Sequence, residues 1–321
     1  MIRFLLRRVL LGALVMLCVT VVVYLIFYVG PGPGFVARAL AGREAPPSTV
    51  ALISRRLLLN RPWFVQYWHF LSQLLHGNLG YDYYHGQSVN SIISQAFPIT
   101  LSLTIGAAII WFALGVLSGV AAAVRPRSLL DRFATFTALL FYSIPTFVLG
   151  LLMLEVFYYQ LTLHGLRWFP PSGYTPISQG LFEWARGLIL PWLTLALVSA
   201  AAYTRLTRAA MLDVLGEDYI RTARAKGLRE SRVTFRHALR AALTPVVTQF
   251  GIDVGALLGG AVITENVFGL PGLGYTAVQA INNQDLPVII GVVILASAAV
   301  VVANLVVDMV YAVLDPRVRL H

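Results

Sequence analysis

The stretch Asp218-Tyr-Ile-Arg-Thr-Ala-Arg-Ala-Lys-Gly-Leu228 is a charged segment that stands between long apolar runs. Asp218 at its start and Lys226 near its end are placed as a helix dipole favours, and Gly227 follows where a helix would stop. Ser231 is expected to cap a second short helix. The stretch therefore predicts two short helices joined by a tight turn.

The residues after this stretch alternate between apolar and basic positions with helical spacing. Phe235, Ala238, Leu239 and Ala242 recur at i, i+3, i+4 and i+7, which predicts one apolar face. Arginines fill the remaining surface, at Arg229, Arg232, Arg236 and Arg240. We therefore predict a compact loop over residues 205–246 whose two short helices share an apolar side.

The composition of the chain requires a membrane. Its 321 residues are 58% hydrophobic and 12% charged, with a mean hydropathy of +0.76. A soluble globule of this composition would leave large apolar areas in water. Apolar runs of about 20 residues can cross the hydrocarbon, and they predict helices at residues 9–29, 100–124, 133–159, 188–203, 247–267 and 288–313. The predicted fold is all-α, with six transmembrane helices in one integral membrane domain over residues 1–321.

Basic residues indicate the orientation of these helices. Both ends of the chain are basic and the number of predicted spans is even, so both termini are expected in the cytosol. Arg125, Arg127 and Arg132 crowd one short connection, whereas residues 268–287 contain no Lys or Arg. The same bias puts the 205–246 loop in the cytosol. It also explains the formal charge of +10, so we expect no nucleic-acid partner.

The connection between the first two spans, residues 30–98, is too long for a structureless loop. Pro46-Pro47 is expected to open a helix that runs through Leu57, Leu58 and Leu59, and Asn60-Arg-Pro62 is expected to break it. An amphipathic helix then follows and ends near Gly77. We therefore predict a structured external segment that rests on the membrane interface.

Candidate reactive groups are few. Cys18 is the one cysteine and lies in the first span, which excludes an internal disulfide and a cysteine-based metal cluster. The sole lysine, Lys226, does not end a phosphate-binding loop, so any ATP that drives this protein must bind another chain. The histidines lie outside the predicted spans and no Gly-x-Ser-x-Gly turn occurs. We expect no catalytic residue, no metal site and no cofactor on this chain.

Several motifs in this order resemble those of the inner-membrane permease subunits of ABC importers for dipeptides and oligopeptides. The resemblance covers nearly the whole chain. In that family the charged loop corresponds to a Glu-Ala-Ala...Gly coupling motif; here Arg221 and Thr222 depart from it, and Ala223 and Gly227 match. The other motifs are Ile2-Arg-Phe-Leu-Leu-Arg-Arg8, Gly77-Asn-Leu-Gly80 with Gly86-Gln-Ser-Val89, Ser143-Ile-Pro-Thr-Phe-Val-Leu-Gly150, Leu270-Pro-Gly-Leu-Gly274 and Leu314-Asp-Pro-Arg-Val-Arg319.

This resemblance implies a permease subunit in a prokaryotic inner membrane, without enzymatic activity of its own. The implied partners are a second, similar permease, two cytosolic ATPase subunits that bind ATP and Mg²⁺, and an external substrate-binding protein docked on residues 30–98. Peptides are the implied cargo, although related permeases serve nickel chelates, opines or haem. The implied ATPase-coupling residues are Asp218, Tyr219, Ile220, Arg221, Thr222, Ala223, Arg224, Ala225, Lys226, Gly227 and Leu228.

Ionisable residues at membrane depth are costly and are therefore candidates for function. Asp253 lies in the fifth predicted span and is followed by glycines, which let helices approach closely or line an aqueous path. Glu155, in the third span, is the second candidate for the translocation path. Glu265 and Asp308 lie near span ends, where a partner helix or interfacial water can satisfy them, so we expect structural roles for both.

Three other interpretations use the same residues. A proton-coupled secondary transporter would need buried carboxylates but not the charged loop. An intramembrane hydrolase would need a pair such as Asp253 and Asp308. The arginine-rich loop itself would, in the third interpretation, only set topology and bind anionic lipid.

Overall fold

The computed structural model describes residues 2–30, 33–41, 45–82 and 85–314. Within them the predicted all-α fold is confirmed, because the only strands are β1 (Tyr81–Asp82) and β2 (Gln87–Ser88), a short antiparallel hairpin. Six helices are long and apolar enough to cross a membrane, as predicted; they cover Leu6–Val29, Val89–Val124, Thr146–Leu163, Leu181–Leu215, Glu230–Leu258 and Leu286–Met309. Of the predicted terminal motif, residues 315–319 lie outside the described part.

The chain divides into two compact units, which are described separately. The first contains residues 1–101, 255–265 and 271–305, and the second contains residues 102–254, 266–270 and 306–321. Three long helices pass from one unit to the other: α5 (Val89–Val124), α12 (Leu239–Leu258) and α15 (Leu286–Leu314). The single transmembrane domain expected for residues 1–321 stays a prediction.

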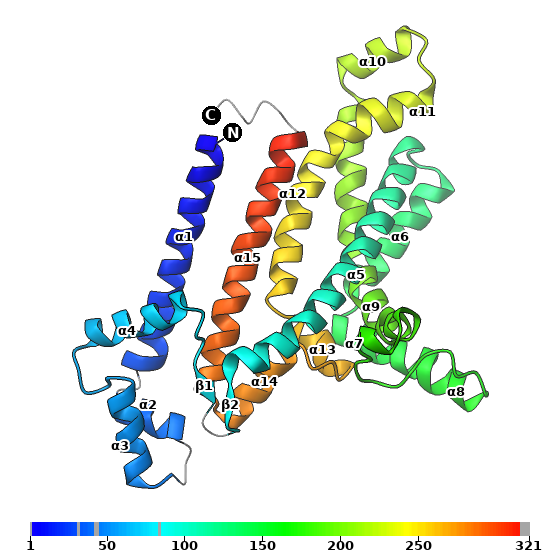
Figure 1. Cartoon of the computed structure of the whole chain (residues 1–321). Helices are drawn as coiled ribbons and strands as arrows, with labels where there is room; N and C mark the ends of the chain where they lie inside the picture. The colour runs from blue at the N-terminus through cyan, green and yellow to red at the C-terminus, as the bar shows by residue number, and fades with distance from the viewer. Residues whose placement is uncertain (1, 31–32, 42–44, 83–84, 315–321) are drawn as a thin grey trace. The chain divides into compact units, whose positions relative to one another are not determined.

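The first unit contains the structured segment that was predicted for residues 30–98. After α1 (Ile2–Tyr24) and a π-helical turn (Leu25–Val29), the chain forms α2 (Pro33–Ala41), α3 (Pro47–Arg56) and α4 (Trp63–Leu75) (Figure 1). Pro47 begins α3 and Pro62 directly precedes α4, because proline suits the first turn of a helix. One detail of the prediction is wrong: α3 ends before Leu57, and Leu58 has a left-handed backbone with φ of 56°.

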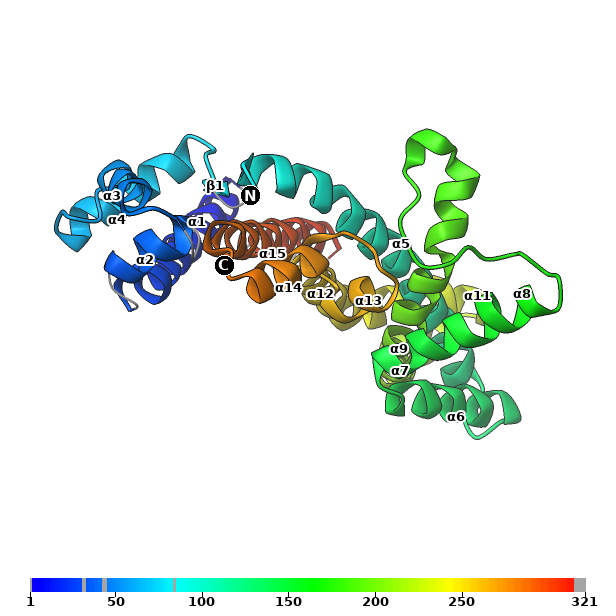
Figure 2. The same cartoon turned by 90° about the horizontal axis from the view of Figure 1, so that it is seen from below.

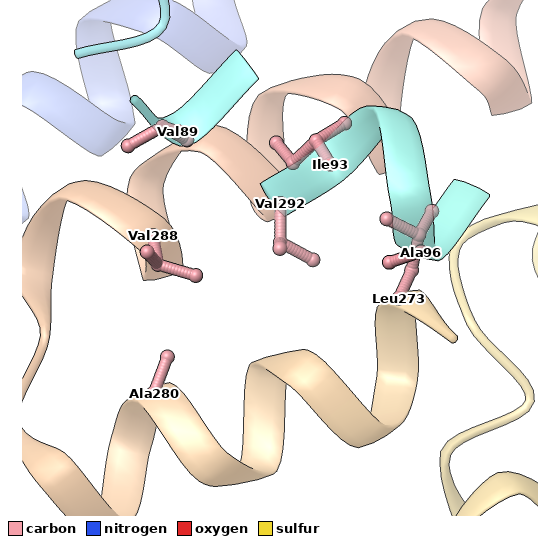
Figure 3. Packing of buried hydrophobic residues seen from close by; sticks show 7 residues of the cluster. All are labelled: Val89, Ile93, Ala96, Leu273, Ala280, Val288 and Val292. Carbon is pink, nitrogen blue, oxygen red and sulfur yellow. The ribbon is translucent and has the colours of Figure 1, made fainter. Parts of the chain in front are cut away.

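The core of the first unit lies where the start of α5 meets α14 (Leu273–Asn283) and the start of α15. Figure 3 shows the side chains of Val89, Ile93 and Ala96 from α5 gathered with those of Leu273, Ala280, Val288 and Val292. Burying these aliphatic groups holds three segments that are distant in sequence. The hairpin residue Ser88 directly precedes α5, so this packing also positions the hairpin.

The second unit is built on α9 (Leu181–Leu215). Figure 2 shows α6 (Leu129–Ser143) and α7 (Thr146–Met153) beside α9, and both helices contact it. The predicted span at residues 133–159 is therefore broken. Ile144 adopts an extended conformation because the next residue is Pro145, which disfavours a helical backbone before it. The span resumes at Thr146 and continues through a π-helical turn (Leu154–Gln160) to α8 (Leu161–Leu163).

The fifth span also differs from its prediction. Residues 247–267 were expected to form one helix, but α12 ends at Leu258 and α13 (Val262–Val267) is a separate short helix. Gly260 separates them with φ of 121°, a conformation that side chains rarely adopt. The span gains length at its other end, because the helix is continuous from Glu230. Of the motif Leu270-Pro-Gly-Leu-Gly274, the first three residues form the turn before α14, and Leu273 and Gly274 begin that helix.

Candidate functional site

The charged loop between the fourth and fifth spans folds as two helical arms, which we call the bracket (residues 217–238). Its first arm is α10 (Asp218–Ala225), and its second arm is α11 (Glu230–Arg232) with the π-helical turn Val233–Ala238 (Figure 1). The second arm continues without a break into α12. A displacement of the bracket would therefore act directly on a transmembrane helix.

A glycine turn closes the first arm. The amide of Gly227 donates to the carbonyl of Arg224 at 2.9 Å, and the amide of Leu228 donates to the carbonyl of Ala223 at 3.4 Å. This pair of bonds is a Schellman motif, whose central residue needs a left-handed backbone. Gly227 has φ of 71°, and a Cβ added there would meet nothing within 4 Å. The prediction that Gly227 ends the first helix is confirmed. Glycine is needed there for the left-handed backbone and not for lack of space.

An ion pair bridges the turn. Arg224 donates through Nη2 to Oε1 of Glu230 at 2.7 Å and through Nε to both oxygens of that carboxylate at 3.2 Å. The hydrogen bonds to Glu230 raise the pKa of Arg224 above its ordinary value, so the guanidinium stays charged. The pair is largely exposed, and its contribution is orientation of the two arms more than stability.

The inner face of the bracket is apolar and packs on its own chain. Ile220 is fully buried and Ala223 is 8% exposed, while Val233 and Ala238 on the second arm are also buried. The first arm contacts the π-helical turn, and that turn contacts α9. Ile220 and Ala223 therefore belong to the predicted coupling segment but do not offer surface for a partner; they fix the angle between its arms.

Two sequence predictions about the second arm are wrong. Ser231 does not cap it, because the arm begins at Glu230 with Arg229 in the capping position. Phe235 is not on the buried stripe, since 58% of it is exposed. The cause is the π-helical turn, in which each hydrogen bond spans five residues and the period of 3.6 no longer assigns faces.

The outer face of the bracket combines exposed aromatic and charged side chains. Tyr219 and Phe235 are both exposed, and Asp218 forms an exposed ion pair with Arg221 at 3.2 Å. Exposed aromatics are enriched where proteins bind one another. Sequence periodicity did not predict that Phe235 is exposed. The feature that could have indicated its exposure is its position between Thr234 and Arg236 in a loop rich in arginine.

A partly buried ion pair joins the helix that leads into the bracket to α6. Arg208 on α9 donates through Nε to Oδ1 of Asp131 at 2.6 Å and through Nη2 to Oδ2 at 2.9 Å. Asp131 lies in the first turn of α6 and also accepts from the amide of Arg127 at 2.8 Å. The hydrogen bond from Arg208 lowers the pKa of Asp131 to about 2, so the carboxylate is ionised at neutral pH. No pattern in the sequence indicated a role for Asp131 or Arg208.

The two candidates for the translocation path have different surroundings. Asp253 on α12 is partly buried; its Oδ2 accepts from the hydroxyl of Tyr203 at 2.8 Å, and its Oδ1 accepts from Nε2 of Gln249 at 2.9 Å. Glu155 is exposed on the π-helical turn and accepts from Nε2 of Gln160 at 2.8 Å. The structure therefore does not join the two carboxylates in one hydrogen-bonded site.

Glu265 has the structural role that the sequence predicted. Its carboxylate is fully buried; Oε1 accepts from the hydroxyl of Thr100 at 2.7 Å and Oε2 accepts from the amide of Tyr275 at 2.9 Å. The Thr100 hydroxyl in turn accepts from the amide of Leu273 at 2.8 Å. A Cβ at Gly272 would lie 2.5 Å from Cδ of Glu265, so this turn requires glycine. The network ties α13 and the start of α14 to α5.

Comparison with known proteins agrees with this architecture. Residues 1–104 match the family model for the N-terminal part of the membrane component of binding-protein-dependent transport systems, and residues 112–320 match the model for their inner membrane component. A probable peptide ABC transporter permease of Sinorhizobium fredii is 41% identical over 98% of this chain and 99% of its own length. A glutathione transport system permease of Salmonella typhimurium is 39% identical over 99% of each chain.

The fold recurs in a solved transporter. An inward-facing structure of the MetNI methionine ABC transporter matches 70% of this chain and 96% of its own chain, with a TM-score of 0.55 and 20% sequence identity. At that identity the match concerns the fold alone. The family models and the full-length relatives carry the assignment: the chain belongs to the binding-protein-dependent transport system inner membrane components, the permease subunits of ABC importers.

Proposed function

We propose that this chain imports di- or oligopeptides as one of two similar permeases in an ATP-driven complex, with its bracket seated on a cytosolic ATPase subunit. The observation that carries the proposal is the bracket itself. It has a buried apolar inner face, an outer face with the exposed side chains of Tyr219 and Phe235, and a direct continuation into α12. Such an element transmits motion because its angle is fixed by its own chain.

The assignment of ATP hydrolysis to partner subunits supports this arrangement. The sole lysine, Lys226, lies at the end of α10 beside the Gly227 turn, outside any phosphate-binding loop. ATP and Mg²⁺ would then act on two partner ATPases, and this chain would hold no catalytic group and no cofactor. An external binding protein would deliver the peptide, with residues 30–98 as its docking platform.

Peptides are proposed as cargo because of the names of full-length relatives. They include the probable peptide permease of Sinorhizobium fredii, a putative peptide transport permease of Brucella abortus at 40% identity, and the permease for glutathione, itself a tripeptide. Family membership leaves the proton-coupled alternative without support. Uptake by the reconstituted complex should require ATP inside and persist when an uncoupler dissipates the proton gradient; the reverse pattern would contradict the proposal.

We also propose that Asp253 and Glu155 face the translocation path. Asp253 supports this best, since its oxygens accept hydrogen bonds from the uncharged side chains of Tyr203 and Gln249, and a passing ammonium group would supply an opposite charge. Asp253→Asn should lower uptake of peptides with a free N-terminal ammonium more than uptake of N-acetylated ones. Equal effects on both would remove Asp253 from the path, and Glu155→Gln tests the second residue in the same way.

The proposed orientation puts both termini and the bracket in the cytosol of a prokaryotic cell. The exposed positions Ala225 on the bracket and Ser48 on α3 provide the test, in a chain whose native thiol is removed by Cys18→Ala. An impermeant thiol reagent applied to intact spheroplasts should label Ser48→Cys and leave Ala225→Cys unlabelled until the membrane is opened. Labelling of Ala225→Cys in intact spheroplasts would invert the topology.

A further inference from the structure

Three potential metal ligands meet in the first unit. Asp82 ends β1, His85 lies in the turn of the hairpin, and Asp285 directly precedes α15. One ligand atom from each of the three lies within 4.8 Å of those of the other two. The hairpin and the start of α15 are about two hundred positions apart in sequence, so only the fold brings these side chains together.

The two carboxylates are oriented by the backbone. Oδ1 of Asp82 accepts from the amide of His85 at 3.0 Å, and Oδ1 of Asp285 accepts from the amide of Val288 at 3.3 Å as the cap of α15. The second oxygen of each faces the imidazole: Nδ1 of His85 is 2.6 Å from Oδ2 of Asp82 and 3.9 Å from Oδ2 of Asp285. Two oxygens and one nitrogen therefore converge from preset directions.

Burial makes a cation at this point favourable. Asp82 is 1% exposed and Asp285 is 8% exposed, so both carboxylates have lost most of their hydration. A divalent ion bound here would offset the cost of burying two carboxyl groups side by side. The His85 side chain is 47% exposed, so the cluster borders solvent on the side of the imidazole.

We propose that Asp82, His85 and Asp285 bind a divalent transition-metal ion, of which Zn²⁺ is the probe. The imidazole nitrogen sets the metal class, because Mg²⁺ and Ca²⁺ favour sites made of oxygen alone, whereas Zn²⁺ takes nitrogen and carboxylate ligands together. The sequence prediction of no metal site considered cysteine clusters and could not join ligands so far apart. The bound ion would fasten the hairpin to the first residue before α15.

The consequence is mechanical. The hairpin leads directly into α5, and the first turns of α5 and α15 pack together through Val89, Ile93, Val288 and Val292 (Figure 3). A metal ion bound by Asp82 and Asp285 would add a second link between the starts of the same two helices. Metal should therefore raise the thermal stability of the transporter, an effect that does not depend on its cargo or on ATP hydrolysis.

The test is Zn²⁺ binding by the purified, chelator-treated transporter complex, prepared without a polyhistidine tag. We expect wild type to bind one more Zn²⁺ per copy of this chain than His85→Gln, and to show a rise in Tm that His85→Gln lacks. Asp82→Asn and Asp285→Asn should weaken binding at least tenfold. His76→Gln is the matched control, since His76 lies nearby in sequence with its Nδ1 on the carbonyl of Ser72, and it should bind like wild type.

Two results would overturn the proposal. The first is equal Zn²⁺ stoichiometry and affinity in wild type and His85→Gln, which would make any bound metal adventitious. The second is a wild-type complex that shows no saturable Zn²⁺ binding, which would leave the cluster as a hydrogen-bonded His and carboxylate group. Because His85 is half exposed, His85→Gln should keep the fold, and its size-exclusion profile checks this; that variant carries the test if the aspartate variants misassemble.

Discussion

Gly227→Val isolates the backbone requirement of the bracket. Valine disfavours the left-handed conformation at φ of 71° by about 1–2 kcal/mol, and no neighbour within 4 Å adds a clash. Against this, burial of Ile220 stabilises the bracket by about 1.5–3 kcal/mol, and the exposed Arg224–Glu230 pair adds at most about 1 kcal/mol. A penalty of this size should raise the population of the opened bracket about 5- to 30-fold.

Limited trypsin digestion measures that population, because Arg221, Arg224, Lys226 and Arg229 place cleavage sites on both sides of the turn. Cleavage of the reconstituted complex should accelerate about 5- to 30-fold in Gly227→Val when opening is fast relative to cleavage. ATP-driven uptake should fall in parallel. Gly227→Asn is the matched control, since asparagine tolerates this conformation and should stay near wild type. Wild-type cleavage in Gly227→Val, or equal acceleration in Gly227→Asn, would refute the argument.

Three further predictions concern groups that hold the helices. Thr100→Val removes the donor to Oε1 of buried Glu265 and the acceptor of the Leu273 amide, so it should destabilise the complex by about 1–3 kcal/mol per group and lower Tm; Thr100→Ser keeps the hydroxyl and should be mild. Gly272→Ala should cost about 1–3 kcal/mol through overpacking against Glu265, and an unchanged Tm would contradict the close approach. Asp131→Asn should lower Tm by an amount that is constant from about pH 5 to about pH 8. In the folded protein the pKa of Asp131 is lowered to about 2, so the stability gained from Arg208 is fully present above the pKa of the unfolded state. It is lost only as pH falls through the pKa of the folded state. A difference that shrinks near neutral pH would show that Asp131 titrates there.

Membrane spans and the charged loop were predictable because each depends on local sequence. Apolar length predicted six spans, and the Gly227 stop predicted the turn, since both follow from residues adjacent in the chain. Segment ends were less predictable. The break at Ile144 and Pro145 lies inside a long apolar run, where hydropathy continues although the backbone does not.

Side-chain facing and long-range partners were not predictable from periodicity. Phe235 is exposed because a π-helical turn changes the phase of its helix, and no sequence rule applied here detects such a turn. Asp131 with Arg208, and Asp82 with Asp285, pair across long stretches of sequence, so their identities as partners follow only from the fold. A structural role for Glu265 was predicted from its position near the end of a span, whereas only the structure shows that Thr100 donates a hydrogen bond to it.

Site-specific crosslinking can show whether the bracket contacts an ATPase subunit. In a Cys18→Ala chain, a maleimide-diazirine reagent is attached to Ala225→Cys on the exposed face of α10. Ala223→Cys, whose position on the same helix is buried, is the control. We expect the Ala225 adduct to join a peptide of the ATPase subunit in a transport-competent complex, and the Ala223 adduct not to do so. An Ala225 adduct with the external binding protein, or with lipid alone in a complex that transports, would contradict it.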